Sequence, residues 1–130
     1  MQIAKLKMNH TYEIIDTGDS NVPTDYHVTF RLGDKCNLEC EYCRWYDGDN
    51  YRFPLECIEN IFEFFKEKNF KTVLFYFHGG EAGIHPLLIK SLEKLREKEK
   101  ETGIRTIIEL QTNLSYTLRR LENVYKLIDN

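Results

Sequence analysis

The chain has 130 residues, of which 42% are hydrophobic and 30% are charged, with a formal net charge of −3. This composition is ordinary for a globular domain with a hydrophobic core, and no basic block indicates nucleic-acid binding. The longest dense apolar run, residues 73–77, is far shorter than the ~20 residues of a membrane-spanning helix. The first 15 residues lack the continuous hydrophobic stretch of a signal peptide. We therefore expect a cytoplasmic protein with no nucleic-acid or membrane partner.

The chain divides into a short N-terminal β extension, residues 1–22, and a core domain, residues 23–130. The extension has a predicted strand at 11–15 and a turn at 16–21 that is rich in Gly, Asp, Ser and Asn. In the core domain, strands are expected at 26–32, 72–77 and 105–111, and helices at 55–68, 86–101 and 116–128. This strand–helix alternation predicts an α/β fold with a parallel sheet.

The three predicted helices each carry an apolar stripe at helical spacing. The stripes are Ile58, Ile61, Phe62 and Phe65; Leu88, Leu92 and Leu95; and Leu118, Leu121, Tyr125 and Ile128. Each predicted strand has an apolar face for these helices and a second face with polar groups, because side chains alternate along a strand. That second face would gather Arg31, Tyr76, His78, Glu109, Gln111 and Asn113. They would either share a site or face solvent because one side of the sheet is uncovered.

Three of the four cysteines, Cys36, Cys40 and Cys43, follow the first core strand within eight residues. In a reducing cytosol, such a cluster favours metal or cluster ligation over disulfides. Three thiolates would leave one iron of a [4Fe–4S] cluster without a protein ligand, and an open position is typical of catalytic metal sites. Cys57 lies beside the apolar stripe of the first helix, where a free cysteine packs as a small hydrophobe.

Two other interpretations of the cysteines remain open. A Cys3His zinc site would use these thiols with His78 or His85, although the second paired knuckle of most structural zinc sites is missing. Three unligated core cysteines are disfavoured by the polar neighbours Asp34, Asn37, Glu39 and Glu41.

The C-x3-C-x2-C spacing, with aromatic Tyr42 just before Cys43, resembles the signature loop of the radical SAM superfamily. The resemblance implies that Cys36, Cys40 and Cys43 bind a [4Fe–4S] cluster and that the region of Tyr42 contacts adenine. It also implies that S-adenosylmethionine (SAM) chelates the fourth iron and is reductively cleaved to a 5′-deoxyadenosyl radical, which abstracts hydrogen from a substrate.

Two further segments resemble motifs of the same family. Gly79, Gly80 and Glu81, followed by Ala82, resemble the GGE(P) motif, which holds the methionine amino group of SAM; the alternative is an ordinary turn. Gln111, Thr112 and Asn113 resemble the QTNG segment of the peptide-modifying, sulfatase-maturase-like branch, with Leu114 in place of glycine. Gln111 or Asn113 would face the cofactor, or Asn113 would cap the last helix.

The resemblance implies a partial (β/α) barrel: about three βα units of a (β/α)6-type barrel, with unprotected sheet edges. We expect an incomplete domain, either a fragment or half of a complex whose second chain completes the barrel. The implied partners are SAM, an electron donor such as flavodoxin or ferredoxin, and a substrate that would be a peptide. The alternatives are a non-catalytic iron–sulfur and SAM-binding half-domain, or a zinc-stabilised structural domain.

Overall fold

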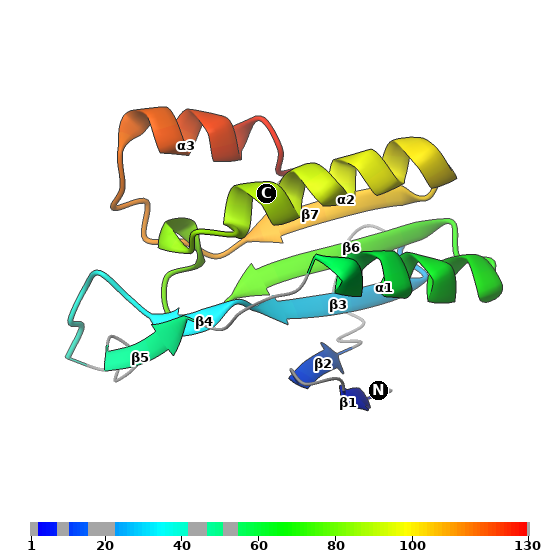
Figure 1. The fold of residues 1–130 in the computed structure, drawn as a ribbon, viewed down its shortest axis with the longest axis horizontal. Coiled ribbons are helices and arrows are strands. Elements are labelled where there is room, and N and C mark those ends of the chain that lie inside the picture. Colours follow the sequence, from blue (N-terminus) through cyan, green and yellow to red (C-terminus); the bar gives the residue numbers. More distant parts are fainter. Residues whose placement is uncertain (1–2, 8–10, 16–22, 42–46, 51–54, 130) are drawn as a thin grey trace.

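The computed structural model describes residues 3–7, 11–15, 23–41, 47–50 and 55–129. Its strands are β1 (Ile3–Lys7), β2 (Thr11–Ile15), β3 (Tyr26–Arg31), β4 (Gly33–Lys35), β5 (Asp47–Asn50), β6 (Thr72–His78) and β7 (Arg105–Leu110). Its helices are α1 (Glu56–Glu67), the short 3₁₀ helix η1 (Ala82–Ile84), α2 (Leu88–Thr102) and α3 (Leu118–Tyr125). Figure 1 shows their arrangement.

The main sheet has the strand order β1-β2-β3-β6-β7. β3, β6 and β7 are parallel, with Val28 beside Phe75 and Phe75 beside Ile108. β2 pairs antiparallel with both β1 and β3. The predicted mixed α/β character, the three-stranded parallel set and the strand at Thr11–Ile15 are therefore confirmed. The β1 strand and the small antiparallel β4–β5 pair were not predicted.

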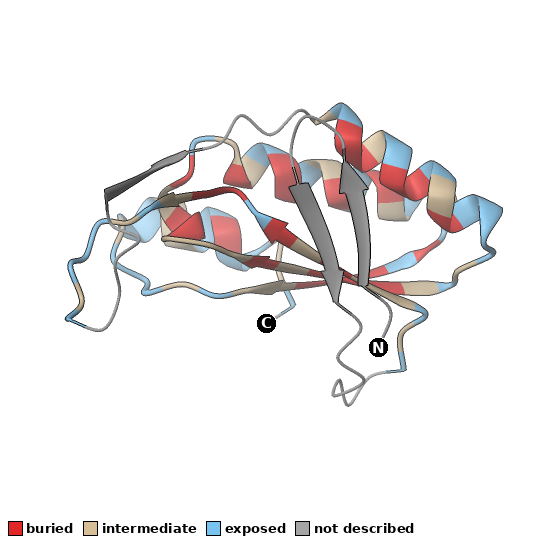
Figure 2. Ribbon diagram, turned by 90° about the horizontal axis from the view of Figure 1, so that it is seen from below, coloured by how far each residue is buried: buried red, intermediate tan, exposed pale blue. Residues whose placement is uncertain are grey.

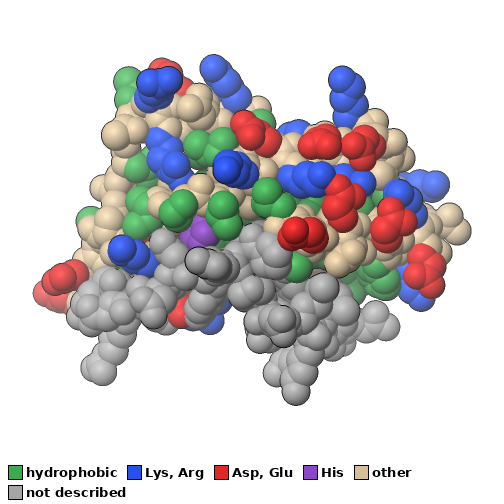
Figure 3. All heavy atoms as spheres, in the orientation of Figure 1, with side chains coloured by type: hydrophobic (Ala, Val, Ile, Leu, Met, Phe, Trp, Pro, Cys, Tyr) green, Lys and Arg blue, Asp and Glu red, His purple; other side chains and the backbone are tan. Residues whose placement is uncertain are grey.

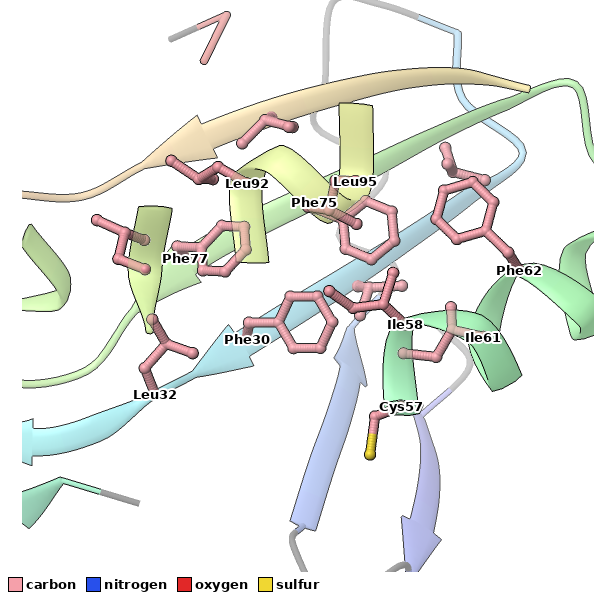
Figure 4. Close-up of a cluster of buried hydrophobic side chains, with 14 of the residues drawn as sticks. Phe30, Leu32, Cys57, Ile58, Ile61, Phe62, Phe75, Phe77, Leu92 and Leu95 are labelled. Carbon is pink, nitrogen blue, oxygen red and sulfur yellow. The ribbon is translucent and has the colours of Figure 1, made fainter. Parts of the chain in front are cut away.

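The hydrophobic core lies between the sheet and helices α1 and α2, which cover one of its faces (Figure 1). The buried residues of both helices form stripes on their inner sides (Figure 2). Phe30, Phe62 and Phe75 stack at the centre, with ring centroids 5.2 Å apart for Phe30–Phe75 and 5.9 Å for Phe62–Phe75 (Figure 4). The predicted alternation of strand faces and the stripes on the first two helices are confirmed, because these side chains are buried against one another.

The third helix turns a different side to the core from the one that its sequence pattern predicts. Leu118 and Tyr125 are 70% and 76% exposed, whereas Val124 is fully buried. The helix is only eight residues long and packs beside α2. Its orientation therefore depends on this contact. The expected stripe is wrong at Leu118 and Tyr125, whereas Ile128, just after the helix, packs against the core as predicted.

Charged side chains of both signs cover the outer surface of α1 and α2 (Figure 3). Between the two helices, the Glu59 carboxylate accepts from Lys94 Nζ at 2.5 Å and from Lys98 Nζ at 2.7 Å. Lys98 is buried, and its ammonium group also contacts Glu101 at 3.0 Å. This cluster joins the two helices on the solvent side of the core.

The edge of the sheet at β7 is closed by side chains, contrary to the expected open edge. Thr106 N donates to Glu99 Oε2 at 2.6 Å, and Thr106 O accepts from Arg96 at 2.7 Å. Ile108 N donates to Asp129 Oδ2 and Ile108 O accepts from Asp129 N, both at 2.8 Å. These groups point away from β6, so the side chains of Arg96 and Glu99, together with Asp129, take the places that a neighbouring strand would fill.

Among the described residues, the structure contains no helix with the length and hydrophobicity needed to cross a bilayer.

Candidate functional site at the carboxyl ends of the parallel strands

Three loops meet at the carboxyl ends of β3, β6 and β7, where the arrowheads of these strands point in one direction (Figure 1). The first loop carries the cysteine motif, the second Gly79–Glu81, and the third Gln111–Asn113. In parallel α/β sheets this edge is the usual position of ligand sites, because loops from several strands converge there. The predicted convergence at this edge is present for the described part of the cysteine loop, up to residue 41, and for the GGE and QTN segments.

The two glycines after β6 fit against the backbone that precedes the cysteines. Gly80 N donates to Gly33 O at 3.0 Å, and Glu81 N donates to Lys35 O at 2.8 Å. A Cβ atom would lie 2.4 Å from Gly33 O at Gly79, and equally close to Asp34 O and Lys35 O at Gly80. Gly79 also has a φ of +132°. The glycines thus allow a close approach between two segments of this chain.

The Glu81 side chain is 4% exposed and joins the second loop to the third. Its Oε1 accepts from Gly83 N at 2.9 Å and from the Thr112 hydroxyl, while its Oε2 accepts from Asn113 N at 2.7 Å. Hydrogen bonds of this kind satisfy a buried carboxylate. Glu81 was expected to bind an ammonium group, and the structure gives it three donors from the protein itself.

Asn113 joins the third loop to the cysteine loop. Its Nδ2 donates to Asn37 Oδ1 at 2.9 Å and lies 3.9 Å from Cys36 Sγ. Asn37 Nδ2 donates in return to Ser115 O at 2.5 Å. Asn113 does not cap the last helix, because the α3 cap is Thr117, whose hydroxyl accepts from Arg120 N. The helix-cap alternative is therefore wrong.

The cysteine loop is closed at its base by the pairing of β4 with β5, in which Lys35 lies opposite Asp47. Cys36 and Cys40 are free thiols that are partly exposed on this loop. Tyr42 and Cys43 lie outside the described residues, so the complete motif is not seen together. Cys57 is buried in the core at the start of α1 (Figure 4), as its position on the apolar stripe predicted.

The polar face of the sheet lies opposite α1 and α2. The Tyr76 hydroxyl donates to Gln111 Oε1 at 2.8 Å, and the Tyr76 ring stacks on His78 with centroids 5.6 Å apart. Burial, with a smaller contribution from the Glu109 carboxylate, raises the pKa of Tyr76 above its usual value. Arg31 is the strand neighbour of His78 and donates to Asp34 Oδ1. Tyr76, His78 and Gln111 of the predicted polar face thus lie in contact, with Arg31 beside His78 on the next strand, whereas the Asn113 side chain lies in the loop beyond β7 and contacts the cysteine loop.

The chemistry of the described donors is compatible with a thiolate-bound cluster. Two thiols of the motif are partly exposed on one loop, beside an amide donor. No group of three His, Cys, Asp or Glu side chains suited to a metal ion occurs in the described part of the chain, from which Cys43 is missing. His85, one candidate for a fourth zinc ligand, is buried, and its Nδ1 accepts from Leu87 N at 3.0 Å.

Sequence reasoning did not assign Asn37, Thr112 or Ser115 to the site. All three lie in the loops at the carboxyl edge. Asn37 and Ser115 connect the cysteine loop to the loop after β7, and the Thr112 hydroxyl connects the loop after β7 to Glu81 in the loop after β6. The available signal was position: Asn37 directly follows the first cysteine, and Thr112 lies inside the QTN segment. Polar residues at the ends of neighbouring parallel strands are candidates for such contacts.

Comparisons with protein-family models, curated proteins and solved structures found no match for this chain.

Proposed function

We propose that this chain is a radical SAM domain that binds a [4Fe–4S] cluster through Cys36, Cys40 and Cys43 and holds SAM beside it. The observation that carries the proposal is the meeting of three motif-bearing loops at one edge of the parallel sheet, joined by Glu81 and Asn113. Each motif alone has a structural explanation, but their common position is what a shared cofactor site requires. A cluster held by these cysteines would, when bound and reduced, supply the electron for reductive cleavage of SAM.

Different residues of the chain would bind the cluster, contact SAM and hold the loops together. The three cysteines provide thiolates, while Tyr42 and Gln111 contribute contacts to the cofactor. Gly79 and Gly80 keep the loop after β6 against the cysteine loop. Glu81 primarily holds the loops, and because a carboxylate accepts about four hydrogen bonds, it retains capacity for the ammonium group of SAM.

The backbone at Leu114 supports the resemblance of the third motif. The family segment has glycine at this position, and Leu114 has a φ of +59°, in the left-handed region that favours glycine. The local conformation thus suits the QTNG pattern although the glycine is absent. Strained positions of this kind cluster at functional sites.

We also propose a partial barrel of three βα units, completed by further strands from a second chain or from additional sequence, that acts on a peptide with electrons from flavodoxin or ferredoxin in the cytoplasm. A strand added beside β7 would have to displace Asp129, which forms hydrogen bonds with both the N–H and the C=O group of Ile108. Completion of the barrel is therefore coupled to a local rearrangement at this edge.

The first test is analysis of iron, sulfide and zinc in protein purified without oxygen and reconstituted. We expect iron and sulfide in the ratio of a [4Fe–4S] cluster, and loss of its absorbance in Cys36→Ala, Cys40→Ala and Cys43→Ala. Cys57→Ala is the matched control and should retain the cluster, because Cys57 is a core residue. Stoichiometric zinc without iron would contradict the proposal.

The second test is conversion of SAM to 5′-deoxyadenosine by the reconstituted, reduced protein. Cleavage that depends on the three motif cysteines supports an enzyme. Cluster binding without cleavage of SAM favours the alternative of a non-catalytic half-domain that needs a partner. This alternative is based on the small size of the parallel set, which has three strands, β3, β6 and β7. In that case, addition of the second chain that completes the barrel should restore cleavage of SAM.

A further inference from the structure

The orientation of the Asn113 side-chain amide is determined by its hydrogen bonds. Its Oδ1 accepts from Ser115 N at 2.8 Å, a backbone donor that cannot change its role. Its amino group therefore faces the other way, where Nδ2 donates to Asn37 Oδ1 at 2.9 Å. Exchange of the two amide atoms would place the amino group against the Ser115 N–H donor and the carbonyl oxygen against the Asn37 Oδ1 acceptor, so the network assigns the amino group to the cysteine loop.

The same amino group lies 3.9 Å from the sulfur of Cys36, the first cysteine of the motif. An N–H group at this position is a weak hydrogen-bond donor to sulfur. Such donors stabilise negative charge on a thiolate, and hydrogen bonds to sulfur are among the factors that set the reduction potential of iron–sulfur clusters.

Asn113 is itself held in place. Its backbone N–H donates to Glu81 Oε2 at 2.7 Å, and Glu81 is buried between the second and third loops. The reciprocal bond from Asn37 Nδ2 to Ser115 O, at 2.5 Å, draws the cysteine loop to the same segment. Movement of the Asn113 amide away from Cys36 would therefore break several hydrogen bonds together.

We propose that Asn113 is a positioning residue for Cys36, whose amide holds the start of the cysteine loop and donates to the Cys36 sulfur. The placement of the loop is a property of the metal-free protein. The consequence for a bound cluster rests on the proposed function: the donor should make its reduction potential less negative than it would be without Asn113.

Amide hydrogen exchange of the metal-free protein tests the placement. Asn113→Ala removes the whole side chain, while Asn113→Asp retains an acceptor for Ser115 N but replaces the donor with a carboxylate oxygen. In both variants we expect amides in residues 33–41 to exchange roughly threefold to tenfold faster, as for the loss of one hydrogen bond. Gln111→Ala is the control, because Gln111 bonds to Tyr76 rather than to the cysteine loop.

Unchanged amide exchange rates in residues 33–41 would overturn the proposal. An equally large increase in exchange throughout α1 and β6 would also overturn it, because it would show a general loss of stability. In reconstituted protein, the cluster potential should shift to more negative values in Asn113→Ala and further in Asn113→Asp, and an unshifted potential would overturn the donor role toward sulfur. If the unmodified protein assembles no cluster, the proposed function fails, and the exchange measurement alone then decides whether Asn113 positions Cys36.

Discussion

The backbone N–H of Asn113 donates to Oε2 of Glu81 at 2.7 Å across a separation of 32 residues. This bond connects the loop after β6 with the loop after β7. Glu81 also accepts from Gly83 N and from the Thr112 hydroxyl, so one buried carboxylate organises the carboxyl edge of the sheet.

Replacement of Glu81 by Ala should destabilise the protein by about 2 kcal/mol, because three donors lose their acceptor and Glu81 is almost fully buried. The free energy of unfolding in urea measures this change. Glu39→Ala is the matched control, since Glu39 is exposed on the neighbouring cysteine loop and should have little effect. Equal stability of the two variants would mean that the Glu81 bonds contribute nothing to folding. If the proposed function holds, Glu81→Ala should also weaken SAM binding while keeping the cluster.

Gly80→Ala should destabilise the protein by about 2 kcal/mol or more through a backbone clash, because its Cβ would lie 2.4 Å from both Asp34 O and Lys35 O. Gly103→Ala separates this effect from conformational strain. Gly103 ends α2 with a φ of +71° and has open space around its Cβ position, so its replacement should cost only about 1 kcal/mol. Thermal or urea unfolding gives both values. A smaller loss for Gly80→Ala than for Gly103→Ala would show that the two loops separate easily.

Leu114→Gly should leave the protein as stable or make it more stable, by up to about 1 kcal/mol. Glycine relieves the strain of a φ of +59° but adds entropy to the unfolded chain, and these effects partly cancel. Little packing is lost, because Leu114 is 56% exposed. Leu38→Gly is the control: Leu38 is also exposed but has no positive φ, so glycine should reduce stability there. A similar loss in both variants would contradict the expectation.

The Glu59 cluster predicts a loss of stability in acid. Hydrogen bonds from Lys94 and Lys98 lower the pKa of Glu59 from 4.5 to about 2. Because the folded pKa is below the unfolded value, the contribution of Glu59 is present above pH 4.5 and is lost as the pH falls toward about 2. In this interval the melting temperature should fall more steeply for the unmodified protein than for Glu59→Gln. As the control, Glu93→Gln at an exposed position should leave the pH dependence of the melting temperature unchanged. Parallel plots of melting temperature against pH for Glu59→Gln and the unmodified protein would contradict the prediction.

Asp129→Ala should open the edge of β7. Ile108 would lose the acceptor for its N–H group, which costs about 1 kcal/mol and leaves this N–H group open to a strand of another chain, while the backbone bond from Asp129 N to Ile108 O remains. We expect faster amide exchange at Ile108 and concentration-dependent association in sedimentation velocity. Asp129→Asn retains a side-chain oxygen and should behave more like the unmodified protein. Unaltered exchange at Ile108 in Asp129→Ala would show that Asp129 does not protect this edge.

The sequence by itself determined the order of the core elements and the two faces of each parallel strand. Period-two alternation in β3 and β6 and helical spacing on α1 are local properties of neighbouring residues, so Phe30, Phe75 and Phe62 could be assigned to the core without knowledge of the fold. It also predicted that three motif-bearing loops would meet at one edge, because parallel strands end on the same side.

Only the tertiary structure decided which groups those loops use to hold one another. The bonds from Thr112 and Asn113 to Glu81, the contact of Asn113 with Asn37, and the closure of β7 by Asp129 join residues that lie 21 to 76 positions apart. The side of α3 that is buried, at Val124 rather than Leu118, likewise depends on packing beside α2. Local periodicity cannot specify such contacts, because each depends on a relative placement of distant segments that exists only after the chain has folded.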